Sequence, residues 1–394
     1  MRNGQMAQDS VYLIECFLQE KYEFRRNVLR GKMEYRKRTE NDKTEEWSVV
    51  TPEAMNSIVR KAKMEGICKK SPRPDIEEYI YSDAVVDFDP IKHHLEHLPQ
   101  WDGQDHVGAL FDRIPGLTTE KRNWCCTWFR SAVAHWLGLD TEHGNESVPV
   151  LIGQQGCGKT TFAIRLLPPS LRCYYLDHIN FGNKFDADMA LTNNLLVNID
   201  EFANMKGGQQ GKLKQTLSRQ KVNGRPIFGK SQEDRRRYAS FIATTNDERP
   251  LNDPTGSRRY ICLQVPKGMM IDNESPIDYG QLYAQALYEI REEHTPYWFS
   301  NEEVERMQQL NQPYLKDYKL DEMICTCYKL PEENEQSNWY LLDHVFDKLK
   351  SQFPTIEDNT SMRIKVGKTL KCMGCSSEHT NKGIKYQLIE LEAA

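Results

Sequence analysis

Residues 148–160 read Val-Pro-Val-Leu-Ile-Gly-Gln-Gln-Gly-Cys-Gly-Lys-Thr, and this stretch decides the fold expected for the chain. The apolar run from Val148 to Ile152 predicts a buried strand, which breaks into a turn with the pattern G-x-x-x-x-G-K-T. Glycines let successive backbone N–H groups point into one concavity, where they hold phosphate oxygens. The stretch therefore predicts a phosphate-binding loop in an α/β fold, because a chance glycine-rich turn would lack the flanking strand and helix.

Each position of this loop has an expected role in binding ATP. Lys159 can reach the β- and γ-phosphates, and the Thr160 hydroxyl can ligate Mg²⁺. A helix from Lys159 to Leu167, stopped by Pro168-Pro169, would direct its positive end at the nucleotide. The residues expected to contact the nucleotide are Gly153, Gln154, Gln155, Gly156, Cys157, Gly158, Lys159, Thr160 and Thr161.

Composition limits the class of protein. The chain has 394 residues, which is enough for two or three domains. Hydrophobic residues make up 39% of the chain and charged residues 28%, a composition that is typical of a globular protein. No run approaches the roughly eighteen apolar residues of a membrane span, and the N-terminus lacks a secretory apolar segment. The eleven cysteines stand singly or in apolar runs, as in reduced proteins. We expect a cytoplasmic protein without a membrane partner.

Two later strands complete the expected ATPase. Residues 195–201 read as a buried strand ending in Asp200 and Glu201. Asp200 would hold Mg²⁺ with Thr160, and Glu201 would activate the attacking water. This strand and the loop strand are expected to be neighbours in a parallel sheet, with both motifs at their carboxyl ends. The strand of residues 238–246 ends in Asn246, which would orient the water near the γ-phosphate.

A pair of arginines follows the third strand. Arg258 and Arg259 come directly after a Gly-Ser turn at 256–257, which suggests an arginine finger that stabilises the transition state. An ordinary surface pair is the alternative reading of these two residues. The order of loop, Asp-Glu strand, Asn strand and arginines fits the AAA+ plan, in which ring subunits share ATP sites.

The central part of the chain, from about Asp89 to Pro313, resembles the virulence-associated protein E family. The motifs that carry the resemblance are Asp89-Pro90-Ile91, Leu98 to Gly103, Val148 to Phe162, Lys214 to Arg219, Thr244-Thr245-Asn246 and Leu251 to Tyr260. One departure is Phe228, where the family usually has a tyrosine. The resemblance implies an AAA+ ATPase core like those of superfamily 3 helicases and poxvirus-type helicase-primases. It also implies a setting on phages and mobile elements, with any primase on another polypeptide.

The net charge of −5 means that a nucleic-acid site must be a local basic surface. Residues 212–237 carry such a surface, and in superfamily 3 rings the corresponding hairpin tracks DNA in the central channel. Asn223-Gly224 is a favourable hairpin turn, although Pro226 limits pairing beside it. A solvated charged face, or a subunit contact, is the alternative. The expected DNA-binding residues are Lys212, Lys214, Arg219, Lys221, Arg225 and Lys230.

The remaining segments suggest five regions. A small α+β or helical domain would occupy 1–85, with a helix over 51–64 capped by Thr51, and it is locally basic over 25–38. A helical region over 86–145, an ATPase core over 146–268 and a helical segment over 269–330 would follow. Residues 331–394 suggest a winged helix: helices over 340–349 and 362–373 and a wing strand over 384–391.

Three further patterns contain residue types that bind metal ions. Asp87-Phe88-Asp89 has the form of a primase metal pair, but the residues ahead of it are too few for that catalytic domain. His93 to His97 fits H-x-x-E-H without a third distal ligand, and Cys325, Cys327, Cys372, Cys375 and His379 lack regular zinc-knuckle spacing. We expect neither set to bind zinc.

The sequence therefore predicts an ATP-dependent, Mg²⁺-dependent DNA helicase motor that forms a ring, most simply a hexamer, on single-stranded DNA. The alternative is an ATP-driven regulatory or assembly factor that binds DNA or protein without unwinding. A DNA-binding scaffold with a degenerate ATP site conflicts with the intact Lys159, Asp200 and Glu201.

Overall fold

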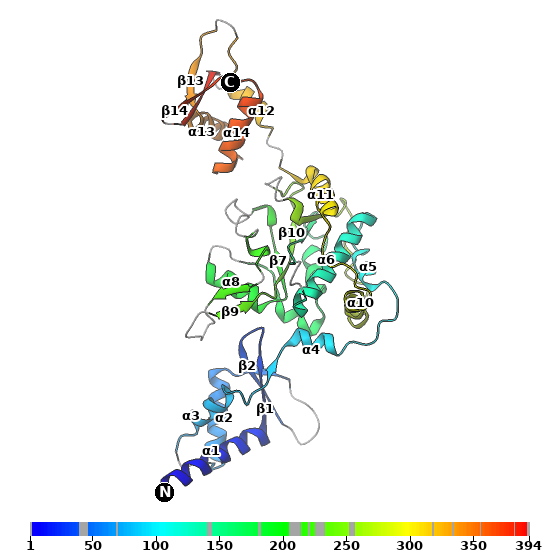
Figure 1. Ribbon diagram of the computed structural model, residues 1–394, viewed down its shortest axis with the longest axis vertical. Coiled ribbons are helices and arrows are strands. Elements are labelled where there is room, and N and C mark those ends of the chain that lie inside the picture. The colour runs from blue at the N-terminus through cyan, green and yellow to red at the C-terminus, as the bar shows by residue number, and fades with distance from the viewer. Residues whose placement is uncertain are drawn as a thin grey trace. The chain divides into compact units, whose positions relative to one another are not determined.

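Figure 1 presents the computed structural model of the chain. The structure describes residues 2–38, 46–67, 70–139, 144–179, 183–204, 213, 215–219, 221–224, 233–251, 257–316, 319–332, 335–354, 356–381 and 383–391. The chain divides into two compact units, Met1–Tyr314 and Leu315–Ala394. The divisions expected from sequence at 85, 145, 268 and 330 stay predictions.

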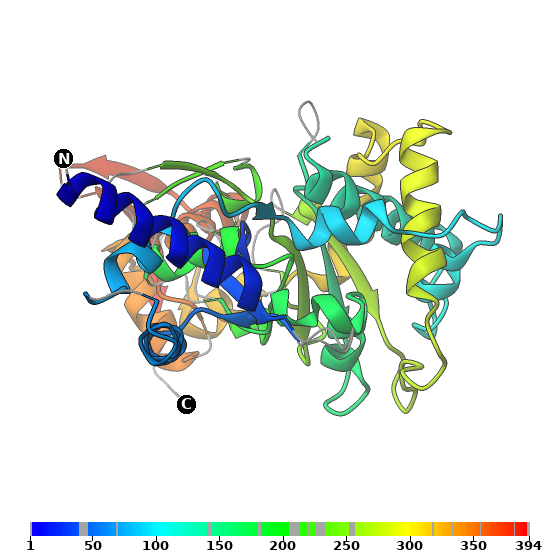
Figure 2. The ribbon, with the colours of Figure 1, turned by 90° about the horizontal axis from the view of Figure 1, so that it is seen from below.

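The first unit begins with a four-stranded sheet in the order β3-β2-β1-β4. Its elements are α1 (Arg2–Lys21), β1 (Tyr22–Asn27), β2 (Lys32–Lys37), β3 (Ser48–Val49), α2 (Pro52–Met64), α3 (Arg73–Ile80) and β4 (Asp87–Phe88). The helices, α1 among them in Figure 2, bury one face of this sheet with Tyr22 and Met33 in the shared core. The expected cap of α2 is confirmed, because the Thr51 hydroxyl accepts a hydrogen bond from the Ala54 N–H at 3.2 Å.

A five-stranded sheet in the order β11-β5-β10-β7-β6 forms the centre of the same unit. Its strands are β5 (Val148–Ile152), β6 (Tyr175–Leu176), β7 (Leu196–Ile199), β10 (Ser240–Thr245) and β11 (Tyr260–Gln264). All neighbours in it are parallel, and β5, β7 and β10 are buried throughout. Their carboxyl ends therefore meet at one edge of the sheet, where α/β proteins bind ligands.

One expectation about this sheet is wrong. The strands that carry the glycine-rich loop and Asp200 are not neighbours, because β10 lies between them. Thr244 of β10 pairs with Leu151 of β5, and Ala243 pairs with Ile199 of β7. The inserted strand places Asn246, the residue after its carboxyl end, between the other two strands.

The helices around the sheet are α4 (Pro90–Glu96), α5 (His106–Phe111), α6 (Thr119–Leu137), α7 (Lys159–Arg165), α8 (Lys184–Asn193), α10 (Tyr279–Arg291) and α11 (Asn301–Leu310). Short 3-10 turns lie at Pro169–Tyr174, Phe202–Asn204, Ser257–Arg259 and Gln312–Tyr314. Trp124, Trp128 and Trp136 of α6 are buried in the main core. Thr118 caps the start of α6, and Gly138 ends it with a φ of 77°.

The basic segment does contain a hairpin, made of β8 (Lys221–Gly224) and β9 (Glu233–Arg236). The predicted turn at Asn223-Gly224 is wrong, since these residues pair with Asp234 and Glu233 within the ladder. The residues between the two strands, 225–232, lie outside the described part of the chain. Pairing in the ladder overrides the local preference of Asn-Gly for a turn.

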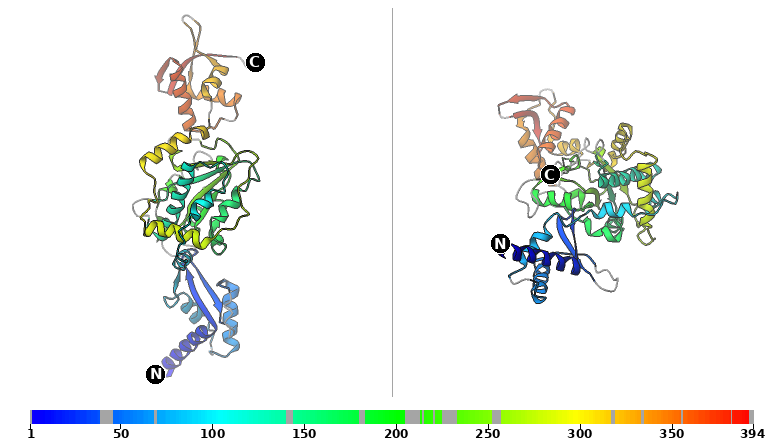
Figure 3. Two further views of the ribbon diagram at one scale, coloured as in Figure 1. Left: turned by 90° about the vertical axis from the view of Figure 1, so that its right-hand side faces the viewer. Right: turned by 60° about the horizontal axis from the view of Figure 1, so that its bottom comes forward.

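The second unit contains α12 (Leu320–Cys327), β12 (Tyr328–Lys329), β13 (Asn338–Leu341), α13 (Leu342–Gln352), α14 (Thr360–Cys372), β14 (Ser377–Thr380) and β15 (Gly383–Glu390), orange to red in Figure 3. Val345, Phe346, Val366 and Leu370 fill a core of its own. Tyr340 and Leu341 were expected in a helix, but they pair with β15. The helix begins two residues later than expected, at Leu342.

Candidate functional site

The glycine-rich loop joins β5 to α7 at the carboxyl edge of the parallel sheet. Gly156 and Gly158 have φ angles of 82° and 91°, in the left-handed region that side chains disfavour. A Cβ at Gly158 would also lie 2.4 Å from Nδ2 of Asn273, so a side chain there would displace the Asn273 amide. Gln154, Gln155, Thr160 and Thr161 are exposed beside them, whereas Cys157 is buried. The loop therefore presents its backbone and hydroxyl groups at the sheet edge.

Lys159 lies across the loop. Its side chain is buried, and Nζ donates to the carbonyl oxygens of Gly153 at 2.8 Å and Gln154 at 2.9 Å. Nζ also donates to Oδ1 of Asn246 at 2.9 Å. The structure thus brings together two residues that the sequence predicted for one site, although 87 positions separate them.

Asp200 follows β7 at the same edge. Its Oδ1 accepts a hydrogen bond from the Thr244 hydroxyl at 2.6 Å. Asn198 Nδ2 donates to the same Thr244 oxygen at 3.3 Å, so a short polar chain runs beneath the carboxylate. Glu201, which comes next, is exposed and has a φ of 50°. This left-handed conformation is rare for a side-chain-bearing residue and marks a constrained position.

Arg258 and Arg259 lie at the other edge of the sheet. They precede β11, whose first residue, Tyr260, pairs with Val148 at the amino end of β5. Since a strand rises about 3.3 Å per residue, β5 separates these arginines from the loop by roughly 16 Å. The structure therefore does not bring them together with Lys159 within one chain.

The two arginines also differ from each other. Arg258 is exposed, whereas the Arg259 side chain retains 17% exposure and lies 3.6 Å from a carboxylate oxygen of Glu146. The residues 252–256 that precede them lie outside the described part of the chain.

Of the six expected DNA-binding residues, the structure describes two. Arg219 and Lys221 are exposed, and Arg219 approaches Asp188 at 4.0 Å. Lys212, Lys214, Arg225 and Lys230 lie outside the described residues.

Three further arginines of the basic segment, 235–237, pack against the protein. Arg235 donates to Oδ1 of Asn193 at 3.0 Å, and Arg236 donates to the His135 carbonyl. Arg237 is almost fully buried and donates to five backbone carbonyls, those of residues 145, 216, 217, 219 and 239. This part of the segment is structural.

The other ligand-like patterns have structural surroundings. Asp89 caps α4 by accepting from the N–H groups of Ile91 and Lys92, both at 3.1 Å. His93 and His97 stack at 4.2 Å on α4. Within the described ranges, no group of three or more His, Cys, Asp and Glu side chains is arranged to hold a metal ion.

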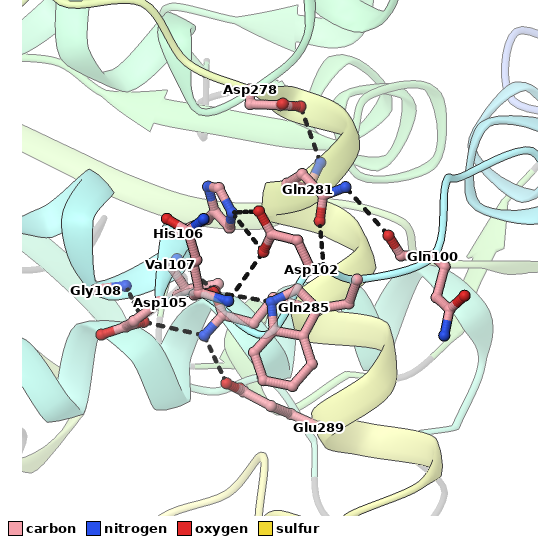
Figure 4. Close-up of polar contacts among 12 residues, drawn as sticks. Gln100, Asp102, Asp105, His106, Val107, Gly108, Asp278, Gln281, Gln285 and Glu289 are labelled. Atoms are coloured by element: carbon pink, nitrogen blue, oxygen red, sulfur yellow. Dashed lines mark hydrogen bonds and ion pairs between the residues drawn. The ribbon is translucent and has the colours of Figure 1, made fainter.

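A polar network anchors the segment around Asp102 to α10, as Figure 4 shows. The buried Gln285 accepts from the Val107 N–H at 2.8 Å and donates to Asp105 at 3.0 Å and Glu289 at 2.7 Å. Gln281 of the same helix accepts from the Asp102 N–H at 2.9 Å. These contacts assign the W-D-G segment a docking role, which sequence reasoning had left open.

A comparison with protein families identifies the family of this chain, and the match includes the glycine-rich loop and the strands beside it. Residues 95–316, more than half of the chain, match the virulence-associated protein E-like domain. The chain belongs to this family. The expected resemblance is confirmed at that level.

Solved structures give a more distant likeness. The chain is similar to the A form apo structure of the NrS-1 C-terminal region, at 10% identity, covering 97% of this chain and 100% of that chain with a TM-score of 0.46. A further apo structure of the NrS-1 C-terminal region is similar at 11% identity, covering 98% and 99%, with a TM-score of 0.44. The search of curated proteins gave no match. Over the residues that the structure describes, no helix has the length and apolar character that crossing a membrane requires.

Sequence reasoning missed two residues of the site. The sequence contained a signal for Thr244, because this residue belongs to the Thr-Thr-Asn motif that is one basis of the family resemblance. Asn273 had none: it lies in an irregular segment after β11, and its Nδ2 donates to the Gly158 carbonyl at 3.0 Å. Only the folded chain brings it to the loop.

Proposed function

We propose that this member of the virulence-associated protein E-like family is an ATP-hydrolysing motor of helicase type, which moves along single-stranded DNA during replication of a phage or mobile element. The observation that carries the proposal is the 2.9 Å contact of Lys159 Nζ with Asn246 Oδ1 beside the glycine-rich loop. The ammonium group of Lys159, which bridges the loop and the end of the neighbouring strand β10, would lie where the terminal phosphate of ATP must be held. Such a motor would act in the cytoplasm.

ATP would bind through its phosphates at residues 153–161. The positive φ angles of Gly156 and Gly158 allow the backbone N–H groups to converge, and Lys159 supplies the charge. On phosphate binding, the ammonium group would exchange the loop carbonyls for phosphate oxygens. This is the arrangement expected of an AAA+ type P-loop core.

Thr160 and Asp200 would hold Mg²⁺, since a hydroxyl and a carboxylate are oxygen ligands of the kind this ion takes. Bound Mg²⁺ would neutralise charge on the phosphates. The hydroxyl of Thr244, 2.6 Å from Asp200 Oδ1, orients that carboxylate. Glu201, exposed beside it, would accept a proton from the attacking water, and the Asn246 amide would orient that water.

The transition state would be completed by a neighbouring subunit. The position of Arg258 and Arg259 at the far sheet edge supports action on another chain, since roughly 16 Å of strand separates them from their own loop. The exposure of Arg258 favours it over Arg259, which lies against Glu146. A ring, most simply a hexamer, would close all such sites.

Single-stranded DNA would contact the basic segment that includes Lys212, Lys214, Arg219, Lys221, Arg225 and Lys230. The exposure of Arg219 and Lys221 next to the β8–β9 hairpin supports this assignment.

A second candidate is an ATP-driven assembly or regulatory factor that does not unwind DNA. The order of elements in the second unit fits a winged helix, whose α14 would contact DNA. However, Arg363 of α14 is 2.8 Å from Asp343 and 3.0 Å from Asp358, which favours a protein contact over DNA.

Phosphate release and strand displacement test the proposal together. We expect ATPase activity that single-stranded DNA stimulates, loss of this activity in Lys159→Ala, and unwinding of a forked duplex of one polarity. Lys267→Ala is the matched control, because Lys267 is an exposed lysine paired with Glu248 at 3.5 Å. ATPase activity that DNA stimulates, without displacement of any duplex, would assign the second candidate instead.

A further inference from the structure

The N-terminal sheet has a second face, opposite its helices, on which aromatic rings and guanidinium groups alternate. Residues of β1 and β2 alternate in direction, so Arg25 and Arg36 lie on this face while Tyr22 and Met33 lie in the helical core. The Arg25 guanidinium carbon is 4.1 Å from the Trp47 ring centroid and 3.5 Å from that of Phe88. The Arg36 guanidinium lies 4.7 Å from Trp47 on the same layer.

Carboxylates hold these guanidinium groups in place. Arg25 Nε donates to Glu34 at 2.7 Å, and Glu34 also accepts from Asn27 at 2.7 Å. Arg36 Nε donates to Glu23 at 2.6 Å. A guanidinium has five N–H donors, so these bonds fix its plane while other donors remain.

Two cavities flank this layer. The larger, about 710 Å³, is lined by Arg36 and Arg38 in addition to the layer itself. The smaller, about 510 Å³, is lined by Arg30 and His97. Both are lined by Arg25, Trp47, Phe88 and His93, so the stacked layer lies between two hollows that each contain further arginine.

We propose that this face binds a segment of single-stranded nucleic acid, with bases stacked on the layer of Trp47, Arg25 and Phe88. Arg36 and Arg38 would contact phosphates in the larger cavity. Four-stranded sheets with stacking side chains on one face bind single strands in this way. The site goes beyond the proposed motor function, whose DNA contacts lie in another part of the chain.

The charge balance favours a stacked base over a merely acidic ligand. In the larger cavity Arg25, Arg36 and Arg38 are matched by Glu23, Asp87 and the nearby Glu34. An acidic peptide therefore gains little from charge here. A base gains from the ring and guanidinium planes, whose attraction does not depend on net charge. The proposal accordingly predicts binding with a shallow salt dependence, because few phosphates are contacted.

The site is tested by measuring, with fluorescence anisotropy, how tightly a fluorescent oligothymidine binds to the full chain without ATP. Trp47→Ala and Arg36→Gln should each weaken binding about tenfold, and Trp47→Phe should restore it, since stacking contributes this much per base. Lys63→Gln, an exposed cation on α2, should bind like the unchanged chain. Arg38→Gln, whose side chain is 54% exposed, supplies a variant that leaves the sheet intact and should weaken binding severalfold.

Photocrosslinking locates the contact. An oligonucleotide with 5-iodouracil should crosslink to peptides that contain Trp47 or Phe88. Lys159→Ala should crosslink equally, because this site does not depend on ATP binding, so failure of the motor proposal would leave this one standing. The proposal is overturned if Trp47→Ala binds within twofold of the unchanged chain, or if crosslinks fall only elsewhere. Displacement of the oligonucleotide by an equal concentration of free dTMP or of polyglutamate would also overturn the proposal.

Discussion

Arg237 shows that the burial of a charged side chain depends on the residues that surround it in the folded chain. It belongs to a basic run expected at DNA, yet its side chain is almost fully buried. Its guanidinium donates to five backbone carbonyls, which replace the hydrogen bonds that water would supply. Composition alone gave no reason to separate it from Arg219 or Lys221, because burial is set by the path of the whole chain.

We expect Arg237→Met to lower the free energy of unfolding by about 3 kcal/mol, since five carbonyls lose a buried donor. Denaturant titration followed by circular dichroism measures this. Lys221→Met is the control, because Lys221 is exposed and its replacement should change stability by less than about 0.5 kcal/mol. Equal effects of the two replacements would contradict the structural role of Arg237.

Thr244 has a defined role, since its hydroxyl donates a hydrogen bond to Asp200. Thr244→Val removes the hydroxyl that donates to Asp200 at 2.6 Å while keeping the shape of the side chain. We expect ATP hydrolysis to slow about tenfold, because a hydrogen bond to a charged group contributes about 1.5 kcal/mol. Thr192→Val serves as the control, since Thr192 is also buried but bonds within α8. A full rate in Thr244→Val would remove Thr244 from the site.

The cysteines give a pH-dependent prediction. Burial raises the pKa of the Cys262 and Cys126 thiols to about 12, so neither forms a thiolate between pH 7 and 9. Among the described cysteines, only the exposed Cys16, Cys173, Cys325 and Cys372 should react with a thiol reagent. Mass spectrometry of the labelled native protein reads this directly. Rapid labelling of Cys262 in the native protein would contradict the burial of this thiol in β11.

Among the elements, those set by local chemistry could be predicted from sequence. The β5 strand, the glycine-rich loop and the cap at Thr51 depend on residues within a few positions of each other. The order of strands could not be predicted, because the insertion of β10 between β5 and β7 depends on long-range pairing. The turn predicted at Asn223-Gly224 failed for the same reason.

The same distinction applies to the site. Lys159, Asp200 and Asn246 were predicted because each follows an apolar strand, and the structure places all three at one sheet edge. Asn273 could not be predicted, since only folding brings residues after β11 to Gly158.

Docking of α10 is tested by two glutamines of that helix. Gln285 is 3% exposed and satisfies Val107, Asp105 and Glu289 at once, so Gln285→Ala should destabilise the first unit by about 2 kcal/mol or more. Gln281→Ala, which removes a more exposed contact to Asp102, should cost less than half of that. Thermal unfolding by differential scanning fluorimetry ranks the two variants. The reverse ranking would contradict the network in Figure 4.

At the scale of the whole molecule, the parallel sheet separates the two halves of the proposed catalytic machinery. The loop, Asp200 and Asn246 lie at the carboxyl edge, and Arg258 lies at the amino edge. On the proposed function, a single chain would therefore supply half of each of two sites. Assembly with like subunits would join the loop edge of one chain to the arginine edge of the next.

Mixing two inactive variants tests this claim most directly. Lys159→Ala lacks a working loop and Arg258→Ala lacks the arginine, so each should hydrolyse ATP poorly alone. In a mixture, an Arg258→Ala loop can meet the intact arginine of a Lys159→Ala neighbour, and we predict that a substantial fraction of ATPase activity returns. A mixture as inactive as its two components, although native mass spectrometry detects mixed assemblies, would contradict a site shared between subunits.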